Sequence, residues 1–322
     1  MNRVVATGAA VLASLGLAAC GGGGGEPGAP RGATLVLDFQ PNAVHAGIYA
    51  ALGEGYYRDA GVDLRVEQPS ASTDAPKLLE AGRTQFAILD IHDLAIAYER
   101  GLDVEGVSPI VERPLAAVIA RRSIRRPRDL EGRTVGVTGL PSDNAVLDSV
   151  LRSDGADPSS VQRVTIGFQA VAALAAGRVD AVTAFWNAEG VALEQRGIPT
   201  RVFRVDDYGA PRYPELWLCT SSGLAKRQPE LVRAVRKATD RGYRFELAHP
   251  GKALDDLLAG ANGLDRAAQQ AQLHALLAAD AVEPGSGLLV PDKAIRWLRW
   301  EIDHGILHSP LPRPPGRMFS RL

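Results

Sequence analysis

Short apolar runs and helix-like segments alternate along the chain from Thr34 to about Val205. A run such as ATLVLDF (residues 33–39) predicts a buried strand, and the loop after it leads into a helix that carries Gly47, Ile48 and Tyr49. Regular alternation of strands and helices is typical of parallel sheets with helices on both faces. We therefore expect an α/β fold.

The same supersecondary pattern occurs twice. LLEAGRTQFAI (residues 78–88) and AALAAGRVDAVTA (residues 172–184) both pass from an apolar helix end through Ala-Gly-Arg into a strand, and the glycine suits the left-handed position after a helix. Two earlier strands precede each copy: ATLVLDF and VDLRVE (62–67), then RTVGVTG (133–139) and VQRVTI (161–166). The pattern predicts one β-α-β-α-β unit built twice; the alternative is a chance likeness between common α/β turns.

Two segments, one between these units and one after the second, predict crossings between two lobes. One is the apolar strand at residues 115–120 with the arginine-rich turn after it, and the other is residues 206–220, which contain two prolines. Two crossings would form a hinge about which the lobes close on a ligand. The predicted division is residues 33–121 plus 213–322 for lobe one and residues 122–212 for lobe two.

Helical spacing dominates from Gln228 onward. A first helix is expected to run to Pro250, and shorter ones follow. The last helix, residues 291–304, places Ile295, Leu298 and Ile302 on one face. We expect these helices to pack on lobe one.

Residues 1–20 differ from the rest of the chain. Arg3 precedes an apolar stretch that is too short to span a membrane and ends in small residues, which predicts a signal peptide. Its last four residues, Leu-Ala-Ala-Cys, resemble a bacterial lipobox, in which the cysteine, here Cys20, is lipid-modified; the alternative is a cysteine there by coincidence. Residues 21–32 are rich in glycine and proline and predict a flexible tether. We expect an exported protein held by lipid on the periplasmic or extracellular face of the cell membrane.

Composition excludes several functions. A formal net charge of -1 gives no field that attracts nucleic acid or an anionic membrane surface, and favours a small neutral or zwitterionic ligand. Cys219 is the only cysteine besides Cys20, so the chain cannot form an internal disulfide in the mature protein or a cysteine metal cluster. Motifs of phosphate loops, serine hydrolases and zinc proteases are absent. These features favour a monomeric binding protein without catalytic residues, cofactor or metal.

Four loops at strand ends are expected to face one crevice, because ligands of open α/β sheets bind at the carboxyl ends of strands. The loops are Phe39–His45, Asp90–Asp93, Gly139–Asp143 and Phe185–Glu189. They combine aromatic with hydrogen-bonding side chains, as a heterocyclic ligand requires. The candidate ligand-binding residues are Phe39, Asn42, His45, Tyr49, Asp93, Ser142, Asp143, Trp186, Asn187 and Glu189.

Each candidate also has a structural interpretation. Phe185 and Trp186 are of a type that most often belongs to the core, and Glu189 is a favourable charge in a first helical turn. Ser142 or Asp143 suits a helix N-cap. His45 suits a packing role at a helix start. The sequence leaves these alternatives open.

The stretch LDFQPNAVHAGIY (37–49), followed by EGYYRDAGVDL (54–64), resembles the solute-binding proteins related to fungal thiamine-pyrimidine synthase, which serve ABC importers. LEGRTVGVTGLPSD (130–143), GRVDAVTAFWNAEGV (177–191) and RVDDYGAPRYPEL (204–216) look like later blocks of that family in family order. Phe39 stands where the family usually has Trp, so an aromatic face survives without the indole donor.

The resemblance implies a two-lobed, type II periplasmic-binding-protein fold that delivers a thiamine-pyrimidine precursor to an ABC permease. In it the ligand stacks on Trp186 and on Phe39 or Tyr49, while acidic and amide side chains read its exocyclic donors. The alternatives are riboflavin or another heterocycle, a sulfonate- or nitrate-type anion, and a pyrimidine-synthesising enzyme. Synthase relatives carry a cysteine-rich iron-binding motif that this chain lacks.

Overall fold

A computed structural model describes residues 30–71, 73–282, 291–308, 311 and 314–320. The predicted signal peptide, Cys20 and most of the predicted tether lie outside these residues. None of the described helices is both long and apolar enough to cross a membrane.

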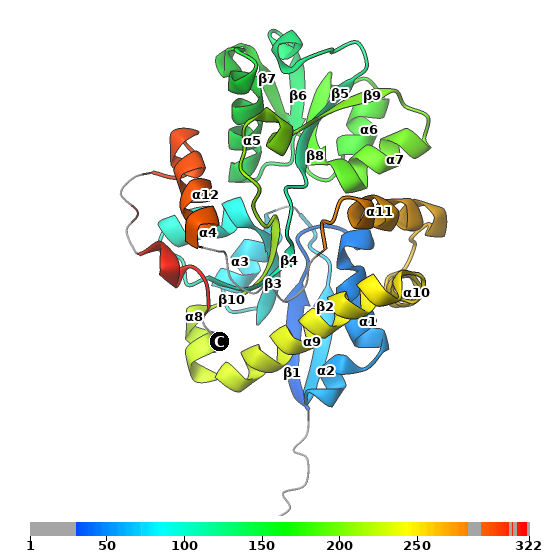
Figure 1. Cartoon of the computed structure of the whole chain (residues 1–322), viewed down its shortest axis with the longest axis vertical. Helices are drawn as coiled ribbons and strands as arrows, with labels where there is room; N and C mark the ends of the chain where they lie inside the picture. The colour runs from blue at the N-terminus through cyan, green and yellow to red at the C-terminus, as the bar shows by residue number, and fades with distance from the viewer. Residues whose placement is uncertain (1–29, 72, 283–290, 309–310, 312–313, 321–322) are drawn as a thin grey trace, which may run out of the picture.

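The first sheet contains five strands in the order β2-β1-β3-β10-β4 (Figure 1). They are β1 (Arg31–Val36), β2 (Val62–Glu67), β3 (Phe86–Asp90), β4 (Glu105–Val111) and β10 (Leu216–Thr220). Strand β1 is parallel to β2 and β3, whereas β10 is antiparallel to both of its neighbours. The sheet is therefore mixed, with one reversed strand.

The second sheet repeats this plan in the order β7-β6-β8-β5-β9. Its strands are β5 (Ala116–Arg121), β6 (Thr134–Val137), β7 (Gln162–Thr165), β8 (Ala181–Phe185) and β9 (Thr200–Arg204). Strand β6 is parallel to β7 and β8, and β5 is antiparallel to β8 and β9. The order β7-β6-β8 matches β2-β1-β3, so the prediction of one unit built twice is confirmed.

Two boundaries differ from those predicted. The strand expected to close lobe one, β5, pairs with β8 and β9 of the second sheet, so the first linker lies before it, at residues 112–115. An apolar strand buried on both faces carries no pattern that says which sheet it joins. Strand β1 begins at Arg31, inside the predicted tether, because its first residues pair through the backbone and remain exposed.

Helices cover both sheets (Figure 1). Lobe one has α1 (Ala46–Gly53), α2 (Tyr56–Asp59), α3 (Asp74–Glu80) and α4 (Ile91–Glu99), and lobe two has α5 (Pro141–Ser153), α6 (Ala170–Ala175) and α7 (Val191–Gln195). The C-terminal part contains α8 (Ser222–Arg227), α9 (Pro229–Ala248), α10 (Pro250–Gly260), α11 (Arg266–Ala278) and α12 (Pro291–Asp303). Short turns are η1 (Ala43–His45), η2 (Pro127–Leu130), η3 (Pro158–Ser160), the π-helical η4 (Trp186–Gly190), η5 (Val205–Tyr208) and η6 (Pro315–Arg317).

Helix α9 lies directly on α1 and fixes the loop before it. Gly242 of α9 approaches Gly47 so closely that a Cβ atom at Gly242 would lie 2.0 Å from the Gly47 carbonyl oxygen. The Tyr243 hydroxyl donates to the carbonyl oxygen of Val44, 2.9 Å away. The pairing therefore anchors η1, which follows β1 at the carboxyl end of the first sheet.

The last helix buries a face centred on its tryptophans, and of the three residues predicted to face the core only Leu298 and Ile302 pack partly against it. Trp297 and Glu301 are fully buried and Trp300 nearly so, whereas Ile295 is 53% exposed. The tryptophan rings bury more apolar surface than the aliphatic side chains do, and they therefore set which face of the helix turns to the core. Glu301 points into lobe one, where it meets His92.

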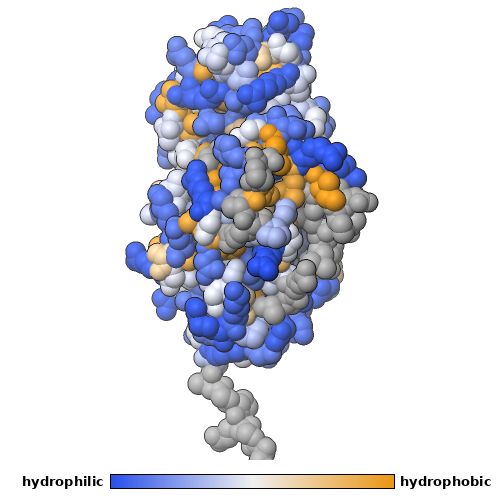
Figure 2. Space-filling model, turned by 90° about the vertical axis from the view of Figure 1, so that its left-hand side faces the viewer, coloured by the Kyte–Doolittle hydropathy of each residue, from blue (hydrophilic) through white to orange (hydrophobic). Residues whose placement is uncertain are grey.

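Helix α11 contacts both lobes. It lies against η1 and α10 on one side and against α7 and η4 on the other, and Gln195 of α7 donates to the carbonyl oxygen of Ala267 at 3.2 Å. The surface in Figure 2 is largely hydrophilic, and its apolar residues gather mainly around the junction of the lobes. The lobes thus touch through more than their two linkers.

Candidate functional site

A cavity of about 100 Å³ lies between the lobes, at the carboxyl ends of the parallel strands. All four predicted loops contribute to it, together with residues of α3, β5, β10 and the β7–α6 loop. Its lining is Asp38, Phe39, Asn42, Val44, Pro76, Asp90, Asp93, Ala116, Ala117, Thr138, Leu140, Ser142, Asp143, Val146, Phe168, Thr183, Ala184, Phe185, Ala188, Glu189 and Leu216. Most of the lining side chains are apolar or aromatic, and most of the polar ones are carboxyls.

The β1–η1 loop is held by His45, which lies beneath the cavity wall. The ring is fully buried, and its Nδ1 accepts the backbone N–H of Asn42 at 3.2 Å. This leaves Nε2 to donate to Asp38 Oδ1 at 2.9 Å. Asn42 Oδ1 in turn accepts the N–H of Val44 at 2.9 Å. His45 therefore positions Asp38 and does not itself line the cavity, contrary to the ligand contact expected of it.

The loop between β6 and α5 is organised by Asp143. Its Oδ2 accepts hydrogen bonds from Thr138 Oγ1 at 2.6 Å and from the N–H groups of Gly139 and Leu140 at 2.9 and 3.2 Å. Its Oδ1 accepts from Thr183 Oγ1 at 3.3 Å. Although Asp143 lines the cavity, both oxygens are already engaged in holding the loop.

After β8, neighbouring aromatic residues point to opposite sides. Phe185 lines the cavity, whereas Trp186 does not. The Trp186 indole donates to the carbonyl oxygen of Pro114 in the first linker at 3.0 Å, and the Arg204 guanidinium lies 3.9 Å from its ring centre. The expectation that Trp186 stacks on the ligand is not supported by this geometry, because its indole is turned to Pro114 and Arg204.

Three other candidates have distinct places. Glu189 lines the cavity, and its Oε2 accepts the N–H of Phe185 at 3.1 Å. Asn187 is fully buried outside the cavity lining. Tyr49 also lies outside it and packs against Gly260 of α10. The predicted ligand contacts of Asn187 and Tyr49 are thus not supported by this geometry.

Sequence reasoning missed an aromatic pair that spans the lobes. Phe168, in the loop after β7, meets Phe39 edge to face with ring centres 4.6 Å apart. Both rings line the cavity. The signal available was position, because Phe168 follows β7 as the other site loops follow their strands. The pair gives a planar ligand two aromatic surfaces from opposite lobes.

The charged side chains in the described lining are all acidic: Asp38, Asp90, Asp93, Asp143 and Glu189. Burial raises the pKa of the Asp90, Asp93 and Asp143 carboxyls, and neighbouring carboxyls raise the first two further. Burial also raises the pKa of Glu189 to about 7, and Asp38 adds to this shift. The cavity therefore favours a ligand rich in N–H donors or carrying a positive charge.

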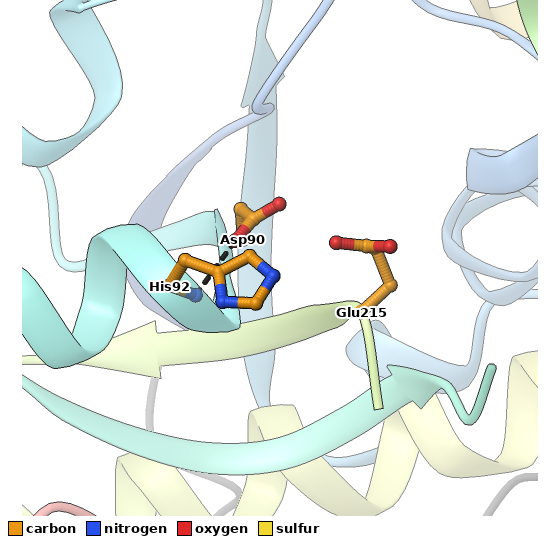
Figure 3. A group of neighbouring side chains, drawn as sticks. All are labelled: Asp90, His92 and Glu215. Carbon is orange, nitrogen blue, oxygen red and sulfur yellow. Dashed lines mark hydrogen bonds between the residues drawn. The ribbon is translucent and has the colours of Figure 1, made fainter. Parts of the chain in front are cut away.

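A second cluster lies at the hinge below the cavity. Glu215, in the second linker, accepts the backbone N–H groups of Leu115, the last residue of the first linker, and of Ala116, the first residue of β5. Ligand-type atoms of Asp90, His92 and Glu215 lie within 4.8 Å of one another, and Figure 3 shows the Glu215 carboxylate directed toward the other two. The two linkers are thus joined at a buried polar centre.

His92 makes this cluster a hydrogen-bonded one. Its Nδ1 donates to Glu301 Oε1 at 2.5 Å and its Nε2 to the Tyr213 hydroxyl at 2.9 Å. Burial alone would lower the pKa of His92, but the Glu301 and Asp90 carboxyls raise it to about 10. An imidazolium with both nitrogens donating has no lone pair for a metal ion. The three-residue group is therefore best interpreted as part of the hinge.

Comparison with known proteins identifies the family. The family model described as NMT1/THI5 like matches residues 42–253. Over 70% of its length the chain is 32% identical to the formylaminopyrimidine-binding protein of Halalkalibacterium halodurans, of which 69% is covered. The chain belongs to the NMT1/THI5-like family. The family also contains enzymes: the 4-amino-5-hydroxymethyl-2-methylpyrimidine phosphate synthase THI12 of Saccharomyces cerevisiae is 26% identical, with 68% of each chain covered.

Solved structures of low identity show the fold of this family member. The alkanesulfonate-binding protein SsuA of Xanthomonas axonopodis pv. citri, bound to MOPS, gives a TM-score of 0.69 at 16% identity, covering 88% of this chain and 96% of that one. The Candida albicans CA3427 gene product, described as having the generic periplasmic binding protein fold, gives 0.68 at 14% identity, covering 90% and 93%. The predicted type II periplasmic-binding-protein fold is confirmed.

Proposed function

We propose that the protein is the solute-binding component of an ABC importer and captures an unphosphorylated aminopyrimidine precursor of thiamine between its lobes. The observation that carries this proposal is the cavity lining, in which aromatic faces stand beside carboxyls and, among the described residues, no Lys or Arg occurs. An aminopyrimidine offers a planar ring for Phe39, Phe168 and Phe185 and N–H groups for the carboxyls. The related formylaminopyrimidine-binding protein supports this choice.

The cavity disfavours the other ligands. Sulfonates and nitrate require a cation or bare N–H groups, and the described lining offers carboxyls and no Lys or Arg. A riboflavin-binding relative, RibY of Chloroflexus aurantiacus, is 27% identical. However, drug-sized ligands occupy cavities of roughly 300 to 1,000 Å³, and this one encloses about 100 Å³. A single ring with small substituents suits it better than a three-ring flavin.

The geometry supports a binding protein over a synthase. His45, the histidine of the 37–49 stretch, is fully buried and bonded to Asp38 and Asn42. Cys219, the remaining thiol of the mature chain, is buried in β10, and burial raises the pKa of its thiol. Neither side chain is placed to react with a ligand in the cavity.

Titration calorimetry of the purified protein tests this proposal. We expect saturable binding of formylaminopyrimidine or hydroxymethylpyrimidine, and no binding of hydroxymethylpyrimidine phosphate, riboflavin, taurine or nitrate. Tight binding of riboflavin or of an anion would replace the ligand class. Formation of a pyrimidine from supplied pyridoxal phosphate and iron would replace the binding role with an enzymatic one.

Export and anchoring at Cys20 complete the proposal and rest on the sequence alone. Expression in a bacterial host should place the protein in the membrane fraction. A Cys20→Ala variant should be released to the soluble fraction, since a cysteine thiol is the site of lipid attachment. Mass spectrometry of the mature N-terminus would identify the lipid, and an unmodified Cys20 in the parent would exclude the anchor.

A further inference from the structure

A hydrogen bond joins the two lobes at the cavity. Ser142, in the first turn of α5 in lobe two, donates from Oγ to Asp93 Oδ2 at 3.1 Å, and Asp93 lies in the first turn of α4 in lobe one. Both residues line the cavity, and their exposed fractions are only 5% and 7%. The contact therefore exists only while the lobes are together.

Asp93 has a second oxygen that the protein leaves unused. Its Oδ1 is buried without a hydrogen-bond partner among the described residues. The neighbouring carboxyls of Asp90 and Asp143 add like charge, and burial together with these carboxyls raises the pKa of Asp93. His92, on the same helix turn, lowers that pKa in part. A buried acceptor in this setting lacks a donor, and such a group is costly to leave unpaired.

We propose that the Ser142–Asp93 hydrogen bond is the latch that holds the lobes closed, and that a ligand N–H donated to Asp93 makes the latch ligand-dependent. This inference rests on the proposed function, because it requires a donor-bearing ligand in the cavity. A donated N–H stabilises the Asp93 carboxylate, and an ionised carboxylate is a stronger acceptor for the Ser142 hydroxyl than a protonated carboxyl. Ligand recognition in lobe one is thereby linked to closure of lobe two.

Asp143 cannot take this role, although it lies beside Ser142. Its two oxygens are engaged by Thr138, Gly139, Leu140 and Thr183, all in lobe two. A carboxyl whose partners belong to one lobe contributes nothing to holding the two lobes together. Asp93 differs because its one intramolecular partner in the described contacts comes from the opposite lobe.

The test compares Ser142→Ala with Ser149→Ala in the full chain. Ser149 lies in the same helix and is fully buried, but its Oγ donates to the Val146 carbonyl oxygen at 2.8 Å, within lobe two. Stopped-flow kinetics with formylaminopyrimidine should show ligand dissociation about tenfold faster in Ser142→Ala. Dissociation from Ser149→Ala should match the parent. Small-angle X-ray scattering should show less ligand-induced compaction in Ser142→Ala alone.

Asp93→Asn provides a second, independent variant. Its carboxamide keeps the shape and one acceptor for Ser142 but replaces an acceptor oxygen by an N–H donor, so we expect weaker ligand binding than in Ser142→Ala. If the parent binds the pyrimidine while Ser142→Ala and Asp93→Asn both release it at the parent rate, the latch is excluded and the proposed function stands. If the parent binds none of the heterocycles, the proposed function and the latch both fail.

Discussion

The carboxylate of Glu215 accepts the backbone N–H of Ala116 at 2.9 Å and so ties the two linkers to each other. The same oxygen accepts the N–H of Leu115, and Glu215 is fully buried. The two linkers are therefore bonded to each other at one buried carboxylate.

Removal of this carboxyl should destabilise the protein. Glu215→Ala leaves two buried N–H groups without a partner, at about 1 to 3 kcal/mol each, so we expect the free energy of unfolding in urea to fall by at least about 2 kcal/mol. Glu215→Gln retains a carbonyl oxygen for both donors and should lose far less. Equal urea midpoints for the parent and Glu215→Ala would show that these hydrogen bonds do not hold the hinge.

The adjacent aromatics Phe185 and Trp186 should separate binding from stability. Phe185→Ala removes a cavity wall, and aromatic stacking is worth about 0.5 to 1.5 kcal/mol beyond buried area, so pyrimidine affinity should fall about tenfold. Trp186→Ala removes a core ring that holds Pro114 and Arg204. It should lower the unfolding free energy by about 3 kcal/mol with affinity little changed. The reverse pattern by calorimetry and thermal melts would return the ligand to Trp186.

The topology and the site loops could be predicted because they depend on local patterns. The repeated Ala-Gly-Arg turn and the strand spacing indicated that the unit of β1, β2 and β3 occurs a second time as β6, β7 and β8. Membership of β5 in the second sheet could not be predicted, because both faces of this strand are buried and apolar. Its partner is chosen by the long-range path of the chain.

Side-chain direction was the other limit. The resemblance favoured Trp186, yet its indole is bound to Pro114 and packs on Arg204, and Phe185 lines the cavity instead. The Tyr49 ring lies outside the cavity because it packs against Gly260, more than two hundred residues later in the sequence. Such packing partners are visible only in three dimensions. The predicted loops do supply part of the lining, namely Phe39, Asn42, Asp93, Ser142, Asp143 and Glu189. Their contacts with ligand stay predictions.

Glu189 should make stability depend on pH. An acid whose folded pKa is raised favours the folded state below its unfolded pKa, and this contribution is lost as pH rises through the folded value. For Glu189 the loss runs from about pH 4.5 to about pH 7. Glu189→Gln has no titrating group at this position. The free energy of unfolding of the variant minus that of the parent should therefore rise between pH 5 and pH 8, by on the order of 1 kcal/mol or more. A difference that is constant across this range would contradict a raised Glu189 pKa.

The close contact of α1 and α9 should not tolerate a side chain. Gly242→Ala places a methyl group 2.0 Å from the Gly47 carbonyl oxygen, so the helices must separate. Overpacking of this kind costs about 1 to 3 kcal/mol, measured as the free energy of unfolding. Gly251→Ala is the matched control, because a Cβ atom there meets nothing within 4 Å and alanine favours a helix. If both variants unfold at the same urea concentration, the contact is looser than described.

The position of β10 between β3 and β4 sets the order in which the molecule can be completed during synthesis. Among the described strands β4 pairs with β10 alone, apart from an isolated bridge between Gly106 and Phe319, and β10 follows all five strands of lobe two. Lobe two, by contrast, takes its strands from one uninterrupted segment, β5 to β9. During synthesis, the sheet of lobe two can therefore form before β10 is available to pair with β4. Lobe one starts first along the chain, but its sheet is completed last.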